Sequence, residues 1–250
     1  MKKFLYLALS LSTSALYAEE NKGNASDPTS AVNFTDFKVQ TYDLGDLGQG
    51  NDRLVYEIEG AYMLSPNDKL TYTLDYWDTD ITGEDENGFD SLKLKYINLT
   101  PGMLGGVKYK LALGAEAINS YGDTDKGIGN GTYQIAPLIG AGWMLGKKDF
   151  LVTLLQYYHS YHEDSDADKV RVTGPRLIWI HSFPEYKMWL KVDNKFSIDH
   201  ENDNDTSNVV EVQLGKMFTP KLGLFVDYFN NTGGYDQYDY GVGFGLRFMY

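Results

Sequence analysis

The sequence predicts an all-β protein: a transmembrane antiparallel up-and-down β-barrel of about 12 strands behind an N-terminal signal peptide. Three observations predict it: an alternating final strand, a regular succession of short and long connections, and a secretory N-terminus. From Tyr240 to Tyr250, even positions are apolar or aromatic, and odd positions are glycine, Arg247 or Met249. Because successive side chains of a strand point to opposite faces, one face is apolar and the other nearly bare. A barrel would turn the apolar face to lipid, whereas a soluble exported β-sandwich would bury it in a core.

The N-terminus has the parts of a secretory signal peptide over residues 1–18. Lys2 and Lys3 precede a short apolar run, and small residues follow as far as Ala15 and Ala18. Cleavage is expected after Ala18, with Ala15 as the alternative. The apolar run is too short for a membrane-spanning helix. Residues 19–31 are then expected to form a periplasmic polar arm that is either disordered or a plug, and residues 32–250 the barrel.

Period-two alternation between turn residues predicts the strands. The expected ranges are 32–42, 53–64, 69–79, 89–99, 107–119, 132–145, 149–162, 169–182, 187–198, 207–218, 222–231 and 239–250. Similar spacing also occurs in solenoid repeats. Here each repeat holds two strands of about ten residues and one long loop, which is the hairpin repeat of an outer-membrane barrel.

Two classes of connection alternate along the chain. The short ones are expected at 65–68, 100–102, 146–149, 183–186 and 219–221. The long ones are acidic and lie at 80–87, 121–131, 163–168, 199–205 and 230–236. Short turns on the periplasmic side and long loops outside are typical of these barrels, and an even number of strands leaves both termini periplasmic.

The composition excludes some classes of partner and some sources of stability. The chain of 250 residues has a net charge of −13 and no cysteine. Removing Lys2 and Lys3 leaves 22 − 2 = 20 basic against 35 acidic residues, or −15. Nucleic acid is therefore excluded as an expected partner. Without disulfides, an exported protein can rely on the complete hydrogen-bond ladder of a closed barrel.

Several strands carry charges in mid-strand on the face opposite the apolar one, and these are the candidate residues of the lumen and its solute. They are Glu57, Glu59, Asp75, Lys93, Lys95, Lys108, Lys110, Glu116, Lys191, Asp193, Glu211 and Arg247, with Lys195 and Asp227 on the same parity. Such charges either form a constriction that selects solutes or a salt-bridge network that fills a narrow barrel. The sequence leaves both interpretations open.

Several stretches resemble a known family. They are residues 25–34, 59–63, 125–131, 134–137, 211–218 and 240–248, and the likeness extends over most of residues 25–250. The chain is similar here to outer-membrane transporter barrels related to the "MetA-pathway of phenol degradation" proteins. The ending Phe248-Met249-Tyr250 also resembles the assembly signal of Gram-negative barrels, which more often ends in Phe. The resemblance implies a location in the outer membrane and a small apolar or aromatic cargo, and it implies no catalytic residue.

Histidines and serines offer a weaker, enzymatic alternative. His159, Ser160 and His162 stand near the expected outer end of a strand, as in outer-membrane lipid hydrolases. A nucleophile needs a base that a third group holds, and the sequence offers no third group. Side chains at 159 and 162 would also point to opposite faces. No catalytic residue is therefore expected.

Acidic loops and a glycine-rich segment have ordinary explanations. Alternating acids at 164–168 and 199–205 could bind calcium, but neither run fits a helix-flanked calcium loop, so solvated loops are favoured. Residues 127–131 read as a loop that enters a strand, because no helix pattern follows. We expect no metal site and no cofactor.

These observations predict a Gram-negative outer-membrane barrel for passive passage or binding of a small solute. Its expected partners are outer-membrane lipid and lipopolysaccharide, and the assembly machinery through the C-terminal strand. The alternatives are a lipid-active hydrolase, and a structural or adhesive barrel with a plugged lumen.

Overall fold

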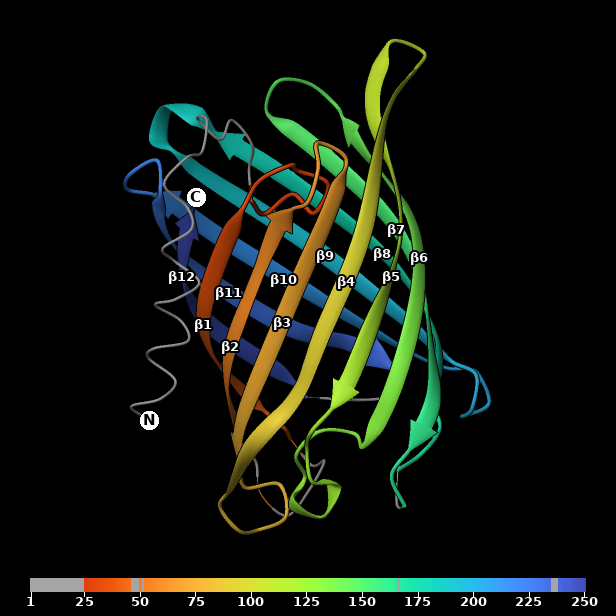
Figure 1. Cartoon of the computed structure of the whole chain (residues 1–250). Coiled ribbons are helices and arrows are strands. Elements are labelled where there is room, and N and C mark those ends of the chain that lie inside the picture. Colours follow the sequence, from red (N-terminus) through yellow and green to blue (C-terminus); the bar gives the residue numbers. More distant parts are fainter. Residues whose placement is uncertain (1–24, 46–49, 51, 166, 235–237) are drawn as a thin grey trace.

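The chain folds into a closed barrel. The computed structural model describes residues 25–45, 50, 52–165, 167–234 and 238–250, so the predicted signal peptide and residues 19–24 lie outside the described part. Twelve strands in that part form one sheet, in which each strand is antiparallel to its neighbours and β1 pairs with β12 (Figure 1). The predicted fold class is confirmed.

The strand bounds follow the predicted ranges closely. The strands are β1 Phe34–Asp43, β2 Asp52–Met63, β3 Asp68–Thr79, β4 Glu86–Leu104, β5 Val107–Ser120, β6 Thr132–Met144, β7 Asp149–Glu163, β8 Arg171–Phe183, β9 Met188–Asp199, β10 Asp205–Met217, β11 Leu222–Gly234 and β12 Tyr240–Met249. Two 3-10 turns, η1 Thr124–Lys126 and η2 Pro184–Tyr186, lie in connections. Among the described residues, no helix is both long and apolar enough to cross a bilayer.

Side chains divide between two faces in the sense that the alternation predicts. The even face of β12 points outward, and Val242, Phe244 and Phe248 are exposed there. On the other face Arg247 and Met249 are buried inside the barrel. Exposed apolar side chains outside and buried polar ones inside reverse the pattern of a soluble protein. The outer surface is therefore built for a lipid environment.

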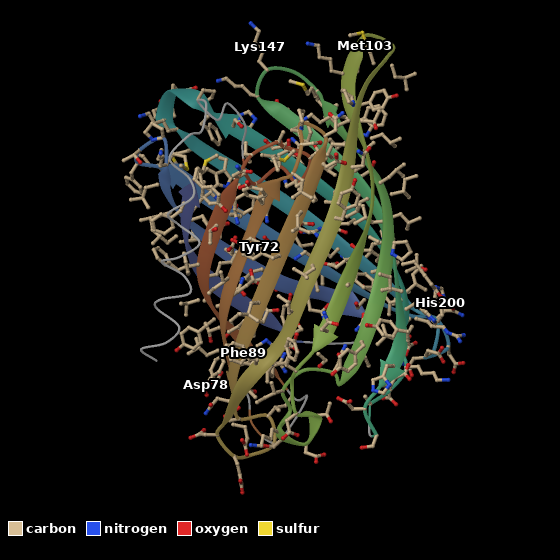
Figure 2. The ribbon with its side chains drawn as sticks, in the orientation of Figure 1. Tyr72, Asp78, Phe89, Met103, Lys147 and His200 are labelled. Carbon is tan, nitrogen blue, oxygen red and sulfur yellow. The ribbon has the colours of Figure 1, made fainter. Side chains whose placement is uncertain are left out.

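The two classes of connection lie at opposite ends of the barrel. Met103 and Lys147 mark the end with short turns, and Asp78 marks the end with long loops (Figure 2). The C-terminus also lies at the end with the short turns (Figure 1). By the usual pattern of these barrels, the short-turn end is periplasmic and the long-loop end faces outward.

The turn predicted at Thr100–Gly102 is wrong. Strand β4 runs on to Leu104, and the chain reverses at Gly105 and Gly106, whose φ angles are 56° and 83°. Glycine suits such positive φ angles because it has no Cβ. β4 leaves β3 at Asn98 but stays paired with β5, so this hairpin projects beyond the wall. Pro101 is tolerated there because β3 does not pair with β4 beyond Asn98, so no strand on that side needs the N–H that proline lacks.

The glycines of β12 make room for aromatic rings inside the barrel. A Cβ on Gly245 would lie 2.0 Å from Cζ of Phe225. Phe225 is fully buried on β11 and has little freedom to move. The bare face of the final strand is thus a packing surface for rings of the neighbouring strands.

Arg247 lies at the seam where the barrel closes. Its Nε donates to Asp36 Oδ1 at 2.9 Å and its Nη2 to Asp36 Oδ2 at 2.6 Å, which joins β12 to β1 in a bidentate fork. The guanidinium also lies 5.0 to 5.2 Å from the ring centroids of Phe34, Trp189 and Phe225. Side chains of three other strands, β1, β9 and β11, therefore converge on one buried cation.

We predict that Gly245→Ala destabilises the barrel by about 1–3 kcal/mol, because the new methyl group overpacks against Phe225. Gly146→Ala, in a turn with nothing within 4 Å, serves as the control and should change stability by less than about 0.5 kcal/mol. Urea unfolding in detergent, with heat-modifiable gel mobility as the readout, measures the stability of both variants. Equal midpoints for the two variants would show that the ring does not constrain β12.

We also predict that Arg247→Lys lowers stability by about 2 kcal/mol, since lysine keeps the charge but loses the fork and most of the stacking. The control is Arg171→Lys at the barrel rim, whose pair with Glu201 is half exposed. Its loss should stay below about 0.5 kcal/mol. The same unfolding assay applies, and a loss for Arg171→Lys as large as that for Arg247→Lys would contradict a special role for the seam.

Candidate functional site

The candidate site is the charged interior of the barrel. All but one of the predicted lumen residues lie on the interior face. These are Glu57, Glu59, Asp75, Lys93, Lys95, Lys110, Glu116, Lys191, Asp193, Lys195, Glu211, Asp227 and Arg247. Lys108 differs, because it pairs with Met103 in the projecting hairpin and is exposed beyond the wall.

Ion pairs connect neighbouring strands around the interior. Lys38 on β1 lies 2.6 Å from Glu57 and 2.8 Å from Glu59, both on β2. Lys93 on β4 contacts Asp75 on β3 at 2.7 Å. These pairs satisfy charges that would otherwise be costly in a confined interior.

The chain of pairs continues across the next strands. Lys95 lies 3.2 Å from Glu116 on β5, whose carboxylate also accepts a 2.6 Å hydrogen bond from Gln156 on β7. Arg176 on β8 forms a two-point contact with Asp193 on β9. Lys191 and Lys195 on β9 both pair with Glu211 on β10.

Within most pairs the cation is the exposed partner. Lys93 is 33% exposed and Asp75 5%, Arg176 is 31% and Asp193 0%, and Lys195 is 37% and Glu211 8%. The carboxylates thus lie against the wall and the basic tips face the lumen. Lys38 is the exception, because Glu59 is more exposed than the lysine. The side of β1 and β2 therefore presents negative charge.

Interior charges that sequence reasoning missed include Asp36, Lys38, Lys69 and Arg176. Asp36 and Lys38 lie on the same parity as Phe34, and Arg176 on the same parity as the buried Ile178 and Ile180. In these strands the interior face mixes charged with large apolar residues, so alternation alone does not tell inside from outside. The closed register of β1 with β2 and β12 decides it.

A cavity of about 390 Å³ lies in the interior beside β7, β8 and β9. Its polar lining includes Tyr158, Arg176, Lys195 and Ser197. The lining also has an apolar part, which includes Leu154, Val170, Val172 and Pro175. These residues lie from the middle of the strands toward the long loops.

The described part of the predicted arm lies inside the periplasmic end of the barrel. Nζ of Lys69, which is 1% exposed, donates to the carbonyl oxygens of Pro28 and Ser30 at 3.1 Å. From β5, Nζ of Lys110 donates to the carbonyl oxygen of Thr29 at 2.9 Å. The arm is therefore held by lysines of the wall.

Further contacts attach the arm to the opposite side. Ser26 Oγ accepts from Arg247 Nη1 at 2.7 Å and donates to Gln213 Oε1 on β10 at 2.8 Å. Ala25 and Val32 pack against Phe34, Ala61 and Met249. Contacts with β3, β5, β10 and β12 place residues 25–32 across the interior.

Asp27 stabilises the turn of this arm. Its Oδ1 accepts hydrogen bonds from the backbone N–H and the hydroxyl of Thr29, at 2.8 and 2.9 Å. Burial raises the pKa of the Asp27 carboxyl, while these hydrogen bonds and the nearby Lys69 and Lys110 act to lower it. The turn thus presents backbone carbonyls to both lysines.

The residues of the hydrolase alternative do not form a catalytic arrangement. Ser160 Oγ faces the interior, donates to Glu163 and accepts from the backbone N–H of Val170. His159 is adjacent in β7, so it points to the opposite face, where its ring stacks on Tyr157. The ring of His162 packs instead against Tyr133. Within the described part of the chain, the hydroxyl of Ser160 is bonded to Glu163 and Val170 rather than to either imidazole.

The long loops use their acidic residues in local structure. Asp199 accepts from the backbone N–H of Glu201 and from the side-chain amide of Asn202. Among the described residues, no group of three or more His, Asp or Glu side chains could hold a metal. Asp166 of the other acidic run lies outside that part. Gly127, Gly129 and Gly131 have positive φ angles in a loop that enters β6, which confirms the loop prediction.

Comparison with known proteins identifies the fold. No family model and no curated protein matches the chain, so the resemblance to the phenol-degradation family stays a prediction. Solved outer-membrane proteins match with low identity. The NanC porin is 9% identical with a TM-score of 0.62, over 86% of this chain and 98% of that one. The COG4313 outer-membrane channel from Pseudomonas putida F1 is 12% identical with a TM-score of 0.63, over 88% and 94%.

An enzyme shares the architecture as well. The outer-membrane phospholipase A from Escherichia coli is 12% identical with a TM-score of 0.55, over 86% of this chain and 92% of that one. At these identities the likeness shows the fold alone. The chain therefore has a β-barrel fold similar to those of the solved outer-membrane porin, channel and phospholipase that it matches.

Proposed function

We propose that this protein is an outer-membrane channel through which a small solute passes passively. The observation that supports it best is the interior itself, where exposed basic tips and a cavity lie between the outer loops and a periplasmic segment. Charged rings inside a barrel select solutes by charge and size. The porin and channel folds that it resembles agree with this assignment.

In this proposal, residues 25–32 act as a periplasmic gate. The segment crosses the interior, yet it is attached by hydrogen bonds, ion–dipole contacts and the packing of Ala25 and Val32 rather than by a strand of the sheet. Such contacts cost about 1–3 kcal/mol each to break, so the segment can leave without loss of the barrel. Lys69 and Lys110 would then line the opened mouth.

The hydrolase alternative receives no support from the side-chain geometry, because Ser160 and His159 point to different faces of β7. The structural-barrel alternative differs from ours in one respect: the interior would stay closed. Transport measurements separate the two.

We predict that deletion of residues 25–31 raises single-channel conductance in planar bilayers severalfold, because it clears the periplasmic mouth. Lys69→Met should raise it as well, since it removes the donors to Pro28 and Ser30. Lys148→Met is the matched control: it removes an exposed lysine of a periplasmic turn whose ammonium pairs with the exposed Glu185 and does not contact the described part of the arm.

The outcomes are distinct. Conductance unchanged by the deletion, in a barrel that still shows heat-modifiable mobility, would exclude the gate. Absence of both conductance and solute flux into liposomes, in the intact chain and in the deletion variant alike, would exclude the channel.

A further inference from the structure

The cavity beside β7, β8 and β9 contains an arrangement of charge that a purely structural ladder would avoid. Arg176 and Lys195 are direct partners in the register of β8 and β9 and lie on the same interior face. Like charges directly opposite each other on neighbouring strands destabilise a sheet. A ladder built only for stability would place an acid opposite one of them.

The counter-charges lie behind the two cations rather than between them. Asp193 and Glu211 oppose each other on β9 and β10, and each contacts a cation diagonally. Both carboxylates are buried, whereas Arg176 and Lys195 are each about a third exposed. Three cations, Arg176, Lys191 and Lys195, share the two acids that they contact directly, Asp193 and Glu211, and the one acid among the described residues that line the cavity is Asp199 at the end of β9.

Groups that recognise an anion surround the exposed ends of Arg176 and Lys195. The fork to Asp193 uses Nε and Nη2 of Arg176 and does not require Nη1. Tyr158 and Ser197 add hydroxyl groups to the same lining. Asp199 also lines the cavity, but its two oxygens accept hydrogen bonds from Glu201 and Asn202 of the loop. A carboxylate between Arg176 and Lys195 would meet charge-assisted donors from two strands.

The remainder of the cavity is apolar and limits the size of the ligand. Val170, Val172 and Leu154 line it, and its volume is about 390 Å³. Sites for small molecules start at about 300 Å³ and combine an apolar wall with a few polar groups. A small inorganic anion would leave this wall in contact with water, and a large polyanion would find too few cations.

We propose that this cavity binds a small organic carboxylate with an apolar body, its head group held by Arg176 and Lys195. The proposal rests on the channel function and names the class of solute. The site extends toward the long-loop ends of the strands, so a solute that enters from outside would meet it before the periplasmic gate.

Benzoate is a suitable probe, with acetate supplying the head group alone and benzyl alcohol the body alone. Calorimetric titration of the detergent-purified full chain should show benzoate binding at least about tenfold tighter than either of the others, a difference of about 1.4 kcal/mol. Equal affinity for benzoate and benzyl alcohol would show that the site does not recognise a carboxylate. Equal affinity for benzoate and acetate would show that it does not recognise an apolar body.

Two lysine variants give a matched test of the residues. Lys195→Gln and Lys191→Gln each remove one of the two lysines that pair with Glu211 and leave the other lysine in place. Only Lys195 lines the cavity, and Lys191 is 13% exposed. We predict that Lys195→Gln weakens benzoate binding about tenfold, while Lys191→Gln changes it less than about threefold. Equal losses would show a general field effect and would exclude the site.

Bilayer recordings on the same preparations keep the two proposals apart. Conductance without benzoate binding would overturn the solute class and leave the channel. Benzoate binding without conductance or flux would overturn the channel and leave a binding site. Heat-modifiable mobility of each variant confirms that a lost titration signal does not reflect a lost fold.

Discussion

Closure of the backbone hydrogen-bond ladder is the constraint on which the whole structure depends. Lipid offers no partner to an N–H or a C=O group, so a sheet that faces lipid must have no free edge. Here the last strand pairs with the first over ten residue pairs, from Phe34 with Met249 to Asp43 with Tyr240. The order of the remaining strands follows from this closure and from short antiparallel connections.

Closure also creates the interior and its chemistry. Charges that a sandwich would expose to water are turned inward, where they must pair or keep their own hydration. The structure pairs them across neighbouring strands, with most carboxylates against the wall and the basic tips toward the lumen. Exposed basic side chains therefore face part of the lumen in a chain whose net charge is −13. Its acidic residues are concentrated in the loops and behind the cations.

One buried cation connects the wall, the arm and the seam. Arg247 binds Asp36 across the closing pair, stacks near three aromatic rings and donates to Ser26 of the arm. Any rearrangement of residues 25–32 thus changes contacts at the point where the barrel closes. This coupling gives a structural role to the one charged residue on the interior face of β12, where the other residues are glycines and Met249.

The sequence by itself determined the strand ranges, the two classes of connection and the face of most side chains, because alternation and turn chemistry are local. It failed at Thr100–Gly102, where Pro101 marks an unpaired edge and the turn comes later at two glycines. Only the tertiary structure decided which charges meet. Residues 36 and 247, or 176 and 195, are brought together by register and curvature, which no local pattern contains. Closure likewise decided that the arm lies inside and that two cations share one cavity.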